Sequence, residues 1–230
     1  NWDGNTYSQT GGPSAMYTAG TNPNYQYSTK MGEDLENDYE EVIAGKDAVR
    51  SWYGAFIALT DGENTVHCIW KYKMGDTDPT NLDAIRLKDD ANWIIYRMAD
   101  VMLMKAEALI WKGKENWQEA VDIINQIRTR ANLLEKTIAI DEEDESSMME
   151  NYLLPERNIE LAAEGKRWYD MIRYAKSKNY AHKSAFIALV QQYNTTANAS
   201  WIRSVLQNEY AWYLPIHADE IENNTLLVQN

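Results

Sequence analysis

The sequence predicts a mainly α-helical protein made of helical hairpins, with a loop-rich aromatic segment and at most short strands ahead of them. Two observations lead to this fold class. Nine of the eleven glycines lie at or before Gly75, and glycine favours turns over helices. From residue 93 onward, apolar residues recur at the spacing of one helix face. We therefore divide a single domain into a loop-rich segment, residues 1–90, and a helical region, residues 91–230.

The loop-rich segment opens with 30 residues rich in asparagine, threonine, serine and glycine, a mixture typical of turns. Two short apolar runs follow, at 52–59 and 65–72, on either side of an Asp61-Gly62 pair that is typical of a turn. Residues 65–72 contain β-branched and aromatic side chains, which favour an extended backbone. We expect a short strand there.

The helical region begins with two amphipathic stripes that predict an antiparallel hairpin. Gly113 ends the first stripe, as a C-cap glycine does. The hairpin is similar to one tetratricopeptide unit, without a repeat array around it. The first stripe contains Ile94, Met98, Val101, Met102, Ala106, Leu109 and Ile110, and the second contains Trp117, Ala120, Val121, Ile124, Ile127 and Ala131.

Shorter helices are expected in the rest of the chain. The acidic run 141–145 is interpreted as a solvated loop that places negative charge before the next helix, where the helix dipole favours it. We expect that helix over 147–163, with Pro155 losing a hydrogen bond unless it starts a new segment, and with Gly165 after it. Further helices are predicted at 166–176, 184–193 and 200–210, and an extended tail from Ala211.

Composition and charge exclude several classes of protein. The chain has 22 Lys and Arg against 35 Asp and Glu, a formal net charge of −13. This balance argues against nucleic acid and anionic membrane surfaces as partners. The single cysteine, Cys68, excludes an intrachain disulfide and a cysteine-rich zinc site. No stretch reaches the roughly 18 uninterrupted apolar residues of a membrane-spanning helix.

Three segments together resemble the SusD/RagB-like family of outer-membrane nutrient-binding lipoproteins. Residues 92–109 look like the family's R-x-A-D-x-x-L-x-x-A-E-A-L helix. Residues 156–173 resemble its E-R-x-x-E-L-x-x-E-G-x-R-W-x-D-x-x-R signature, and residues 214–221 its closing L-P-I-P-x-x-E-I motif. His217 stands where the family usually has proline. The resemblance is firm over residues 90–230 and loose before them.

The resemblance implies the C-terminal part of a longer cell-surface lipoprotein of the bacterial outer membrane. Its signal peptide and lipid anchor are then absent from this chain, and the anchor is its expected link to the membrane. The family's function implies non-catalytic binding of an oligosaccharide or polysaccharide. The implied partner is a TonB-dependent, SusC-like transporter barrel that takes up the glycan.

The second segment also carries a chemical pattern of its own. Glu156, Glu160 and Glu164, which we call the carboxylate ladder, recur every four residues along one helix face. We expect Arg157, Arg167 and Arg173 to pair with these glutamates and with Asp170. A catalytic carboxylate pair needs two groups across a cleft with different acidities, which neighbours on one face do not provide. The interpretation is therefore structural, and no catalytic residue is predicted.

Metal and cofactor sites have little support in the sequence. His217 and Glu220 lie one helical turn apart, but no third ligand is evident. The chain lacks HExxH and the glycine-rich motifs that hold nucleotides. We predict neither a metal nor a cofactor.

The candidate glycan-binding residues lie in the first 30 residues. Nine tryptophans and fifteen tyrosines stand against two phenylalanines, and an aromatic ring with a polar edge suits a half-wet sugar site. Burying roughly 100 Å² of sugar on such a ring contributes about 2.5 kcal/mol, and neighbouring amides and carboxylates bond the hydroxyls. The residues are Trp2, Asp3, Asn5, Tyr7, Tyr17, Tyr25 and Tyr27.

Three alternatives remain open. The aromatic side chains of the first 30 residues can instead hold glycine-rich loops onto the helices. A peptide-capturing relative on the same scaffold needs strand edges and pockets rather than an aromatic platform. A helical adaptor for protein partners needs apolar residues exposed on its helices.

Overall fold

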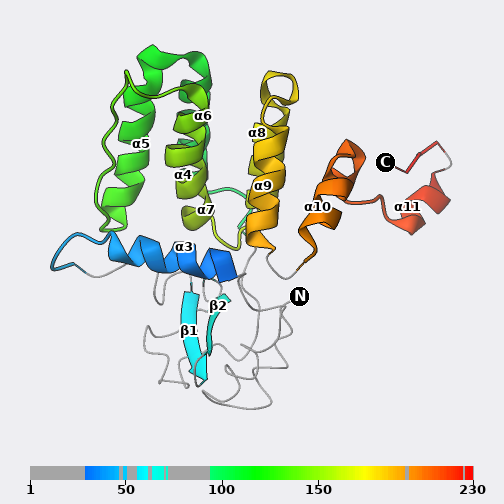
Figure 1. Cartoon of the computed structure of the whole chain (residues 1–230), viewed down its shortest axis with the longest axis horizontal. Helices are drawn as coiled ribbons and strands as arrows, with labels where there is room; N and C mark the ends of the chain where they lie inside the picture. Colours follow the sequence, from blue (N-terminus) through cyan, green and yellow to red (C-terminus); the bar gives the residue numbers. More distant parts are fainter. Residues whose placement is uncertain are drawn as a thin grey trace. The chain divides into compact units, whose positions relative to one another are not determined.

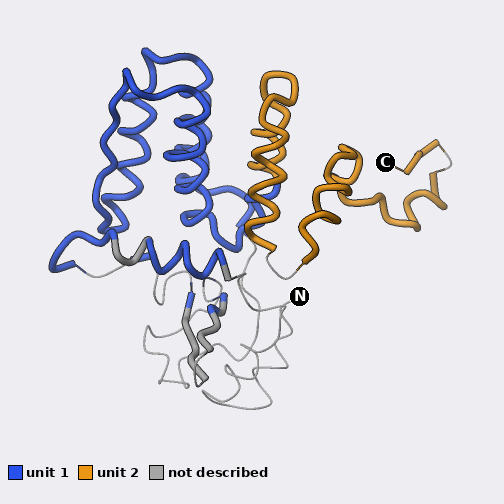
Figure 2. The backbone as a smooth tube through the Cα atoms, viewed as in Figure 1, with its two compact units in different colours: residues 1–168 blue, residues 169–230 orange. Residues whose placement is uncertain are grey.

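The computed structural model describes residues 29–46, 49–50, 56–61, 64–69, 71, 94–194, 197–224 and 226–229. It forms two compact units, residues 1–168 and 169–230, shown separately in Figure 2. The described part is mainly helical, as the sequence predicts, and its helices and strands are labelled in Figure 1. No helix in the described ranges is long and apolar enough to cross a membrane.

The first unit starts with elements that lie in the loop-rich segment. Helix α3, Thr29–Glu40, was not predicted from the sequence. Strands β1, Phe56–Asp61, and β2, Asn64–Ile69, form a two-stranded antiparallel hairpin in which Asp61 faces Asn64. The predicted strand is thus confirmed, with an earlier end than expected, whereas Gly62 of the predicted turn lies outside the described residues. Helix α3 contacts both β2 and the later helix α7, Leu154–Glu160.

Helices α4, Met98–Lys112, and α5, Trp117–Arg130, form the predicted antiparallel hairpin (Figure 1). The short 3-10 helix η3, Lys114–Asn116, fills the turn between them. Trp117 is buried at the start of α5, and its Nε1 donates to the Ile110 carbonyl oxygen at 3.1 Å. The tetratricopeptide-like character of this hairpin stays a prediction. Apolar side chains that are fully buried in it are Leu103, Ala106, Ile110, Ala120, Val121 and Ile124.

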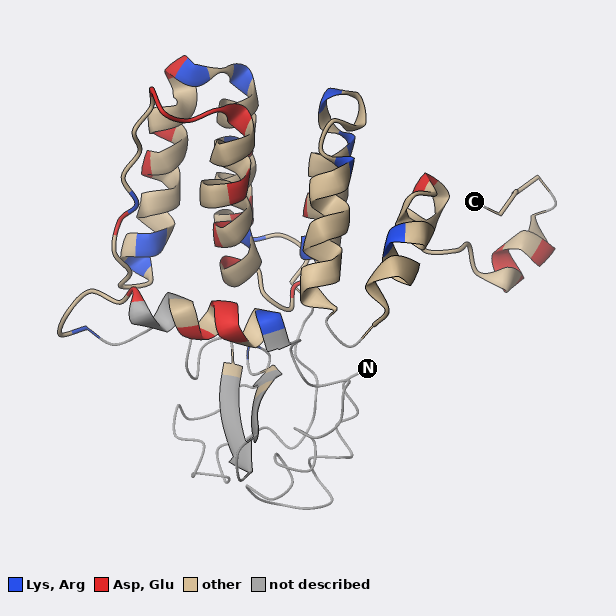
Figure 3. Cartoon of the chain, viewed as in Figure 1, with Lys and Arg blue, Asp and Glu red and all other residues tan. Residues whose placement is uncertain are grey.

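The acidic run 141–145 leads into the next helix as expected (Figure 3). Asp144 caps helix α6, Glu145–Ser147: its Oδ1 accepts from the Ser147 amide at 2.8 Å, and the Ser147 hydroxyl accepts from the Asp144 amide at 2.9 Å. This reciprocal capping box places a carboxylate at the positive end of the helix dipole. The interpretation of the run as a helix start is confirmed.

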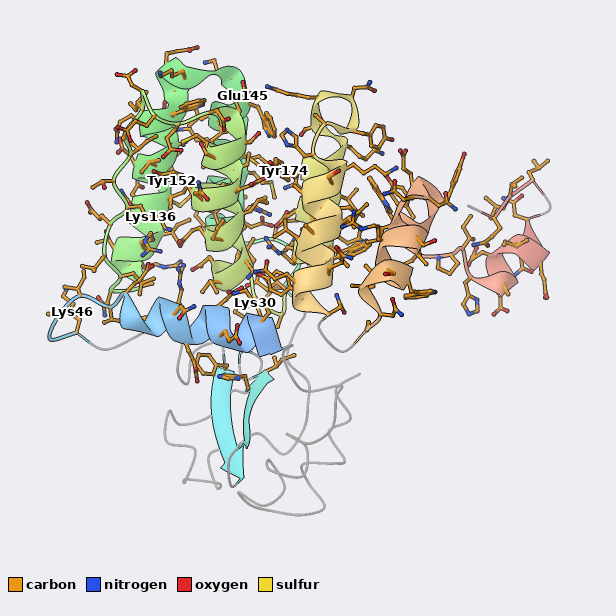
Figure 4. The ribbon with its side chains drawn as sticks, viewed as in Figure 1. Lys30, Lys46, Lys136, Glu145, Tyr152 and Tyr174 are labelled. Carbon is orange, nitrogen blue, oxygen red and sulfur yellow. The ribbon has the colours of Figure 1, made fainter. Side chains whose placement is uncertain are left out.

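The predicted helix over 147–163 is divided and shorter. A π-helix, η4, covers Met148–Leu153, and α7 then starts so that Pro155 lies in its first turn, where a missing N–H costs least. The carbonyl oxygen of Asn151, four residues before Pro155, accepts from Lys136 Nζ at 3.4 Å. Figure 4 labels Lys136 and Tyr152; the Tyr152 hydroxyl lies 2.9 Å from Glu143 Oε1. Helix α7 ends at Glu160, before the expected Gly165.

The second unit contains most of helix α8, Arg167–Tyr180, then α9, Lys183–Tyr193, and α10, Ala199–Leu206. The backbone of α8 leaves helical geometry at Ser177, which agrees with the predicted helix end at Lys176. Asn198 caps α10 by accepting from the amides of Ser200 and Trp201. A 3-10 helix, η5, Glu209–Trp212, takes the place of the expected end of that helix.

The predicted extended tail is wrong in part, because α11 covers Ala218–Asn223. His217 precedes α11, and its Nδ1 accepts from the Asp219 amide, so a local cap starts a helix that the sequence pattern did not reveal. Trp212 ends η5 and lies near the start of this region. It is buried, its Nε1 donates to the Leu206 carbonyl oxygen at 2.9 Å, and its ring meets Phe186 edge-on at 4.8 Å.

Candidate functional site

The predicted glycan-binding residues lie outside the described residues. Trp2, Asp3, Asn5, Tyr7, Tyr17, Tyr25 and Tyr27 all belong to residues 1–28. Their role stays a prediction. The functional chemistry that the structure does describe centres on the carboxylate ladder of Glu156, Glu160 and Glu164.

The carboxylate ladder lies in the interior of the first unit. The side chains of Glu156, Glu160 and Glu164 are 1%, 3% and 0% exposed. Glu156 and Glu160 belong to α7, and Glu164 lies in the turn after it. A carboxylate buried this deeply stays ionised only where cations and hydrogen-bond donors replace its water. The identity of those cations therefore decides what the ladder does.

Glu156 is held by arginines from two distant parts of the chain. Arg128, near the end of α5, donates through Nη1 to Glu156 Oε2 at 3.0 Å. Arg50 donates through Nη1 to Glu156 Oε1 at 2.6 Å. Arg128 also pairs through Nη2 with Glu41, directly after the end of α3. This first step of the ladder connects α7 with α5 and with the chain after α3.

Three arginines donate hydrogen bonds to Glu160. Arg97 and Arg130 both donate to its Oε1, and Arg50 donates to Oε2 at 3.0 Å. Burial by itself raises the pKa of Glu160, but the hydrogen bonds from Arg97 and Arg130 and the charges of Arg50 and Arg97 outweigh it and lower the pKa to about 2. Glu160 is therefore ionised at any physiological pH.

Glu164 is held by Arg97 and Lys71. The Arg97 Nε lies 2.9 Å from Glu164 Oε1 and 3.0 Å from Oε2, while Lys71 Nζ donates to Oε1 at 2.6 Å. Lys71 also donates to the Glu160 carbonyl oxygen at 2.9 Å. Burial lowers the pKa of Lys71 more strongly than Glu164 raises it. Burial also opposes the charge on Arg97, yet its bonds to Glu164 and Glu160 raise its pKa overall.

A second buried ion pair, between Arg157 and Asp100, joins α7 to α4. Arg157 Nη2 donates to Asp100 Oδ1 at 3.0 Å, and Lys166 Nζ lies 3.1 Å from Asp100 Oδ2. The side chains of Asp100 and Arg157 are 0% and 2% exposed. Arg97 and Asp100 belong to the R-x-A-D segment, whereas Arg157, Glu160 and Glu164 belong to the E-R-x-x-E segment. The two motifs therefore bind each other through oppositely charged residues.

These contacts add to the pairing expected from the sequence. Arg157 Nη2 donates to Asp100, and Arg167 donates through Nη1 to the Leu154 carbonyl oxygen at 3.0 Å. The expected pair of Arg173 with Asp170 is confirmed, at 2.9 Å. Residues close along one helix were predicted to pair with each other. The ladder also takes cations from segments far away in the sequence, which spacing alone does not reveal.

The arrangement offers little to acid–base chemistry. Each ladder carboxylate is buried and bound to at least two cations, so it is not open to water or to a substrate. His217, singled out from the sequence beside Glu220, caps α11. Within the described ranges, no group of three His, Cys, Asp or Glu side chains is placed to hold a metal ion.

The described part also presents aromatic rings to solvent that the sequence analysis did not single out. Tyr96 lies before α4, with Lys166 Nζ 4.3 Å from its ring centroid. In the second unit, Trp201 and Tyr210 are exposed, and the Tyr213 hydroxyl accepts from Lys176 Nζ at 2.8 Å. That hydrogen bond raises the pKa of Lys176. Exposed rings inside an amphipathic pattern have the same spacing signal as buried ones, so sequence alone did not separate them.

The chain is similar to known proteins along nearly its whole length. The model of the SusD family matches residues 3–230. SusD-like protein P38 of Formosa agariphila is 40% identical over 96 residues, which are 39% of this chain and 18% of that protein. SusD-like protein P2 of the same organism is 32% identical over 148 residues, which are 62% of this chain and 26% of that protein.

A solved structure supports the fold. A SusD superfamily protein from Bacteroides thetaiotaomicron superposes with a TM-score of 0.51 at 22% identity, covering 89% of this chain and 38% of that one. The chain thus spans less than two fifths of the relatives it matches. Since the family model covers almost every residue, including both charged motifs that meet at the carboxylate ladder, the chain belongs to the SusD family.

Proposed function

We propose that this chain is part of a non-catalytic protein of the bacterial cell surface that binds an oligosaccharide or polysaccharide. The bound glycan passes to a TonB-dependent, SusC-like transporter in the outer membrane, and a lipid anchor holds the protein to that membrane. Membership of the SusD family over residues 3–230 carries the proposal. The saturated, buried state of the ladder carboxylates supports binding rather than hydrolysis.

The glycan-binding surface we propose is formed by Trp2, Asp3, Asn5, Tyr7, Tyr17, Tyr25 and Tyr27. Aromatic rings stack on the apolar face of a sugar, while the nearby amide and carboxylate groups bond its hydroxyls. Contacts in a shallow polar site of this kind offset little of the entropy that ligand and side chains lose on binding, so the affinity is modest. The net charge of −13 favours neutral glycans over highly sulfated ones.

Calorimetry of the complete protein against plant, host and microbial glycans tests this proposal. Trp2→Ala, Tyr7→Ala and Tyr17→Ala are compared with Trp201→Ala and Tyr169→Ala, which remove exposed rings far along the chain. We expect saturable binding of one glycan class, lost in at least one of the three early variants and kept in both controls.

Three results would contradict this proposal. Binding that survives all three early substitutions would move the glycan site elsewhere. Peptide binding without any glycan binding would replace the sugar by a peptide ligand. Retention of a protein partner alone would favour the adaptor, whose apolar surface the exposed Ile95, Met98 and Val101 would then supply.

A further inference from the structure

The basic residues of the second unit are concentrated in one part of its sequence, a stretch from residue 173 to residue 203 that contains no Asp or Glu. Residues 169–230 hold five basic and five acidic residues, so the formal net charge of −13 is carried by residues 1–168. An anion therefore meets no net negative charge within the second unit. Figure 3 shows blue segments gathered at the end of α8. The five basic residues are Arg173, Lys176, Lys178, Lys183 and Arg203.

Helix α8 ends in a left-handed turn of three residues, Lys178, Asn179 and Tyr180, whose φ angles are 49°, 57° and 65°. Residues other than glycine and asparagine avoid this region of backbone conformation. The Ala181 amide donates to the Ser177 carbonyl oxygen at 3.3 Å and closes the turn. Strained backbone of this kind is often found where a protein binds a ligand, so the surroundings of the turn were compared with what a ligand needs.

Side chains near α9 and η5 hold this turn in place. The ring centroids of Tyr180 and Trp212 are 5.9 Å apart, and a hydrogen bond to the Glu209 carboxylate raises the pKa of Tyr180. Lys183 Nζ donates to the Gln207 carbonyl oxygen at 2.9 Å and lies 3.4 Å from Glu209 Oε1. The end of α8 and the chain around η5 are therefore fixed to each other.

This arrangement places an ammonium group beside an exposed aromatic ring. Lys176 Nζ lies 2.8 Å from the Tyr213 hydroxyl oxygen and 5.4 Å from the ring centroid, so it sits at the hydroxyl end of the ring. Tyr213 is 43% exposed. Among the described residues, no carboxylate lies within ion-pair distance of Lys176. An ammonium has three donors and Tyr213 takes one, which leaves two for an acceptor from outside the chain.

We propose that Lys176 and Tyr213 form a binding site for an acidic saccharide, a sugar chain whose residues carry a carboxylate. The carboxylate pairs with the Lys176 ammonium, and the apolar face of the sugar stacks on the Tyr213 ring. An acidic peptide would use the cation alone, so the exposed ring beside it favours the saccharide. This site goes beyond the proposed function and involves only residues of the second unit.

Calorimetry of the complete protein with matched acidic and neutral sugars tests this site. Oligomers of galacturonate, glucuronate and mannuronate provide the acidic probes, and the methyl esters of the same oligomers provide the neutral ones. We expect at least one acidic oligomer to bind about fivefold more tightly than its ester, the gain from one exposed ion pair. This difference should shrink at high salt, because salt screens exposed charges.

Lys176→Met removes the charge and keeps an unbranched side chain. We expect it to abolish the preference for acid over ester while the ester affinity stays within about twofold of the parent, and Lys176→Arg should keep the preference. Tyr213→Ala should weaken the binding of acid and ester alike, whereas Tyr213→Phe keeps the ring and should bind the ester like the parent. Lys105→Met and Trp201→Ala are the controls, since they remove an exposed lysine of the first unit and an exposed ring of α10.

Equal affinity of the parent for acid and ester, absence of binding to every oligomer, or a preference that survives Lys176→Met would overturn the site. A glutamate oligomer that binds as tightly as the best acidic sugar, and equally well in Tyr213→Ala, would replace the saccharide by an acidic peptide. Trp2→Ala should leave the preference for acid over ester unchanged. Failure of this site is thereby distinguished from failure of the candidate glycan-binding residues.

Discussion

The ionisation of Glu160 is coupled to the folded state more strongly than its sequence context suggests. An ordinary glutamate has a pKa near 4.5, and the arginines around Glu160 lower it to about 2. The folded state therefore binds this proton only well below the pH at which the unfolded chain does. Its contribution to stability is fully present above pH 4.5 and is lost as the pH falls through 2, on the order of 3 kcal/mol in total.

Glu160→Gln should remove this dependence. At neutral pH we expect the free energy of unfolding to fall by about 3 kcal/mol, because the surrounding arginines lose their counter-charge. Between pH 4.5 and 2 the variant should lose stability less steeply than the parent, as measured by urea unfolding at a series of pH values.

Glu119→Gln is the control for this substitution. Glu119 pairs with Lys105, but both side chains are more than half exposed, at 54% and 61%. An exposed pair contributes about 0–1 kcal/mol, so this variant should stay close to the parent at every pH. Parallel pH profiles for Glu160→Gln and the parent would rule out a coupled buried carboxylate.

At this same scale, the sequence was informative about which glutamates act together, and less so about their burial and their partners. The four-residue spacing of Glu156, Glu160 and Glu164 predicted one shared face and a structural role. It favoured local partners such as Arg157. The observed partners Arg50, Lys71 and Arg128 lie far away in sequence, and only the folded backbone brings them within reach. Long-range pairing leaves no periodic signal in one chain.

At the scale of elements, the α4–α5 turn depends on one backbone conformation. Gly113 has φ 128° and ψ 170°, a backbone conformation that residues other than glycine avoid. Its amide donates to the Ile110 carbonyl oxygen at 3.3 Å, which closes α4 before η3 begins. The prediction that Gly113 ends this helix is confirmed, and the conformation explains why glycine is needed.

Gly113→Ala should destabilise the first unit by about 1–3 kcal/mol, measured by chemical unfolding, because the new Cβ strains the backbone. Gly45→Asn provides the comparison. Gly45 has φ 79° with open space around its Cβ position, and asparagine tolerates that region, so its loss should stay below about 1 kcal/mol. Equal losses at the two glycines would show that the turn does not require its observed conformation.

Long amphipathic elements were the easiest to predict. The hairpin of α4 and α5 follows from a stripe of apolar residues and a glycine between them. The π-helix η4 and the helix α11 did not follow. A π-turn depends on how neighbouring segments pack around one extra residue, and α11 is too short to show a periodic face.

At the scale of the whole molecule, each unit has its own apolar core. In residues 169–230 this core includes Tyr174, Phe186, Ile187, Leu206 and Trp212. Trp212 combines a buried ring, an edge-on contact with Phe186 and a hydrogen bond to the chain at Leu206. Trp212 is the largest fully buried side chain among the described residues, so its removal leaves a large cavity.

Trp212→Ala should cost about 3–5 kcal/mol, the range of large core truncations. We expect amide exchange to lose protection in α9 and α10 first, while α4 and α5 keep theirs. Trp201→Ala removes an exposed ring from α10 and should change stability by less than about 0.5 kcal/mol. Loss of protection throughout α4 and α5 in Trp212→Ala would mean that the two units unfold together.

The carboxylate ladder also limits which substitutions this protein can accumulate. A surface residue drifts freely, and an apolar core residue can be exchanged for another of similar volume. A buried glutamate that binds cations from several segments has no equivalent replacement. Replacing either the glutamate or one of its cations leaves other buried charges without a counter-charge. We therefore expect replacements at these glutamates to be tolerated less often than replacements at surface or apolar core positions.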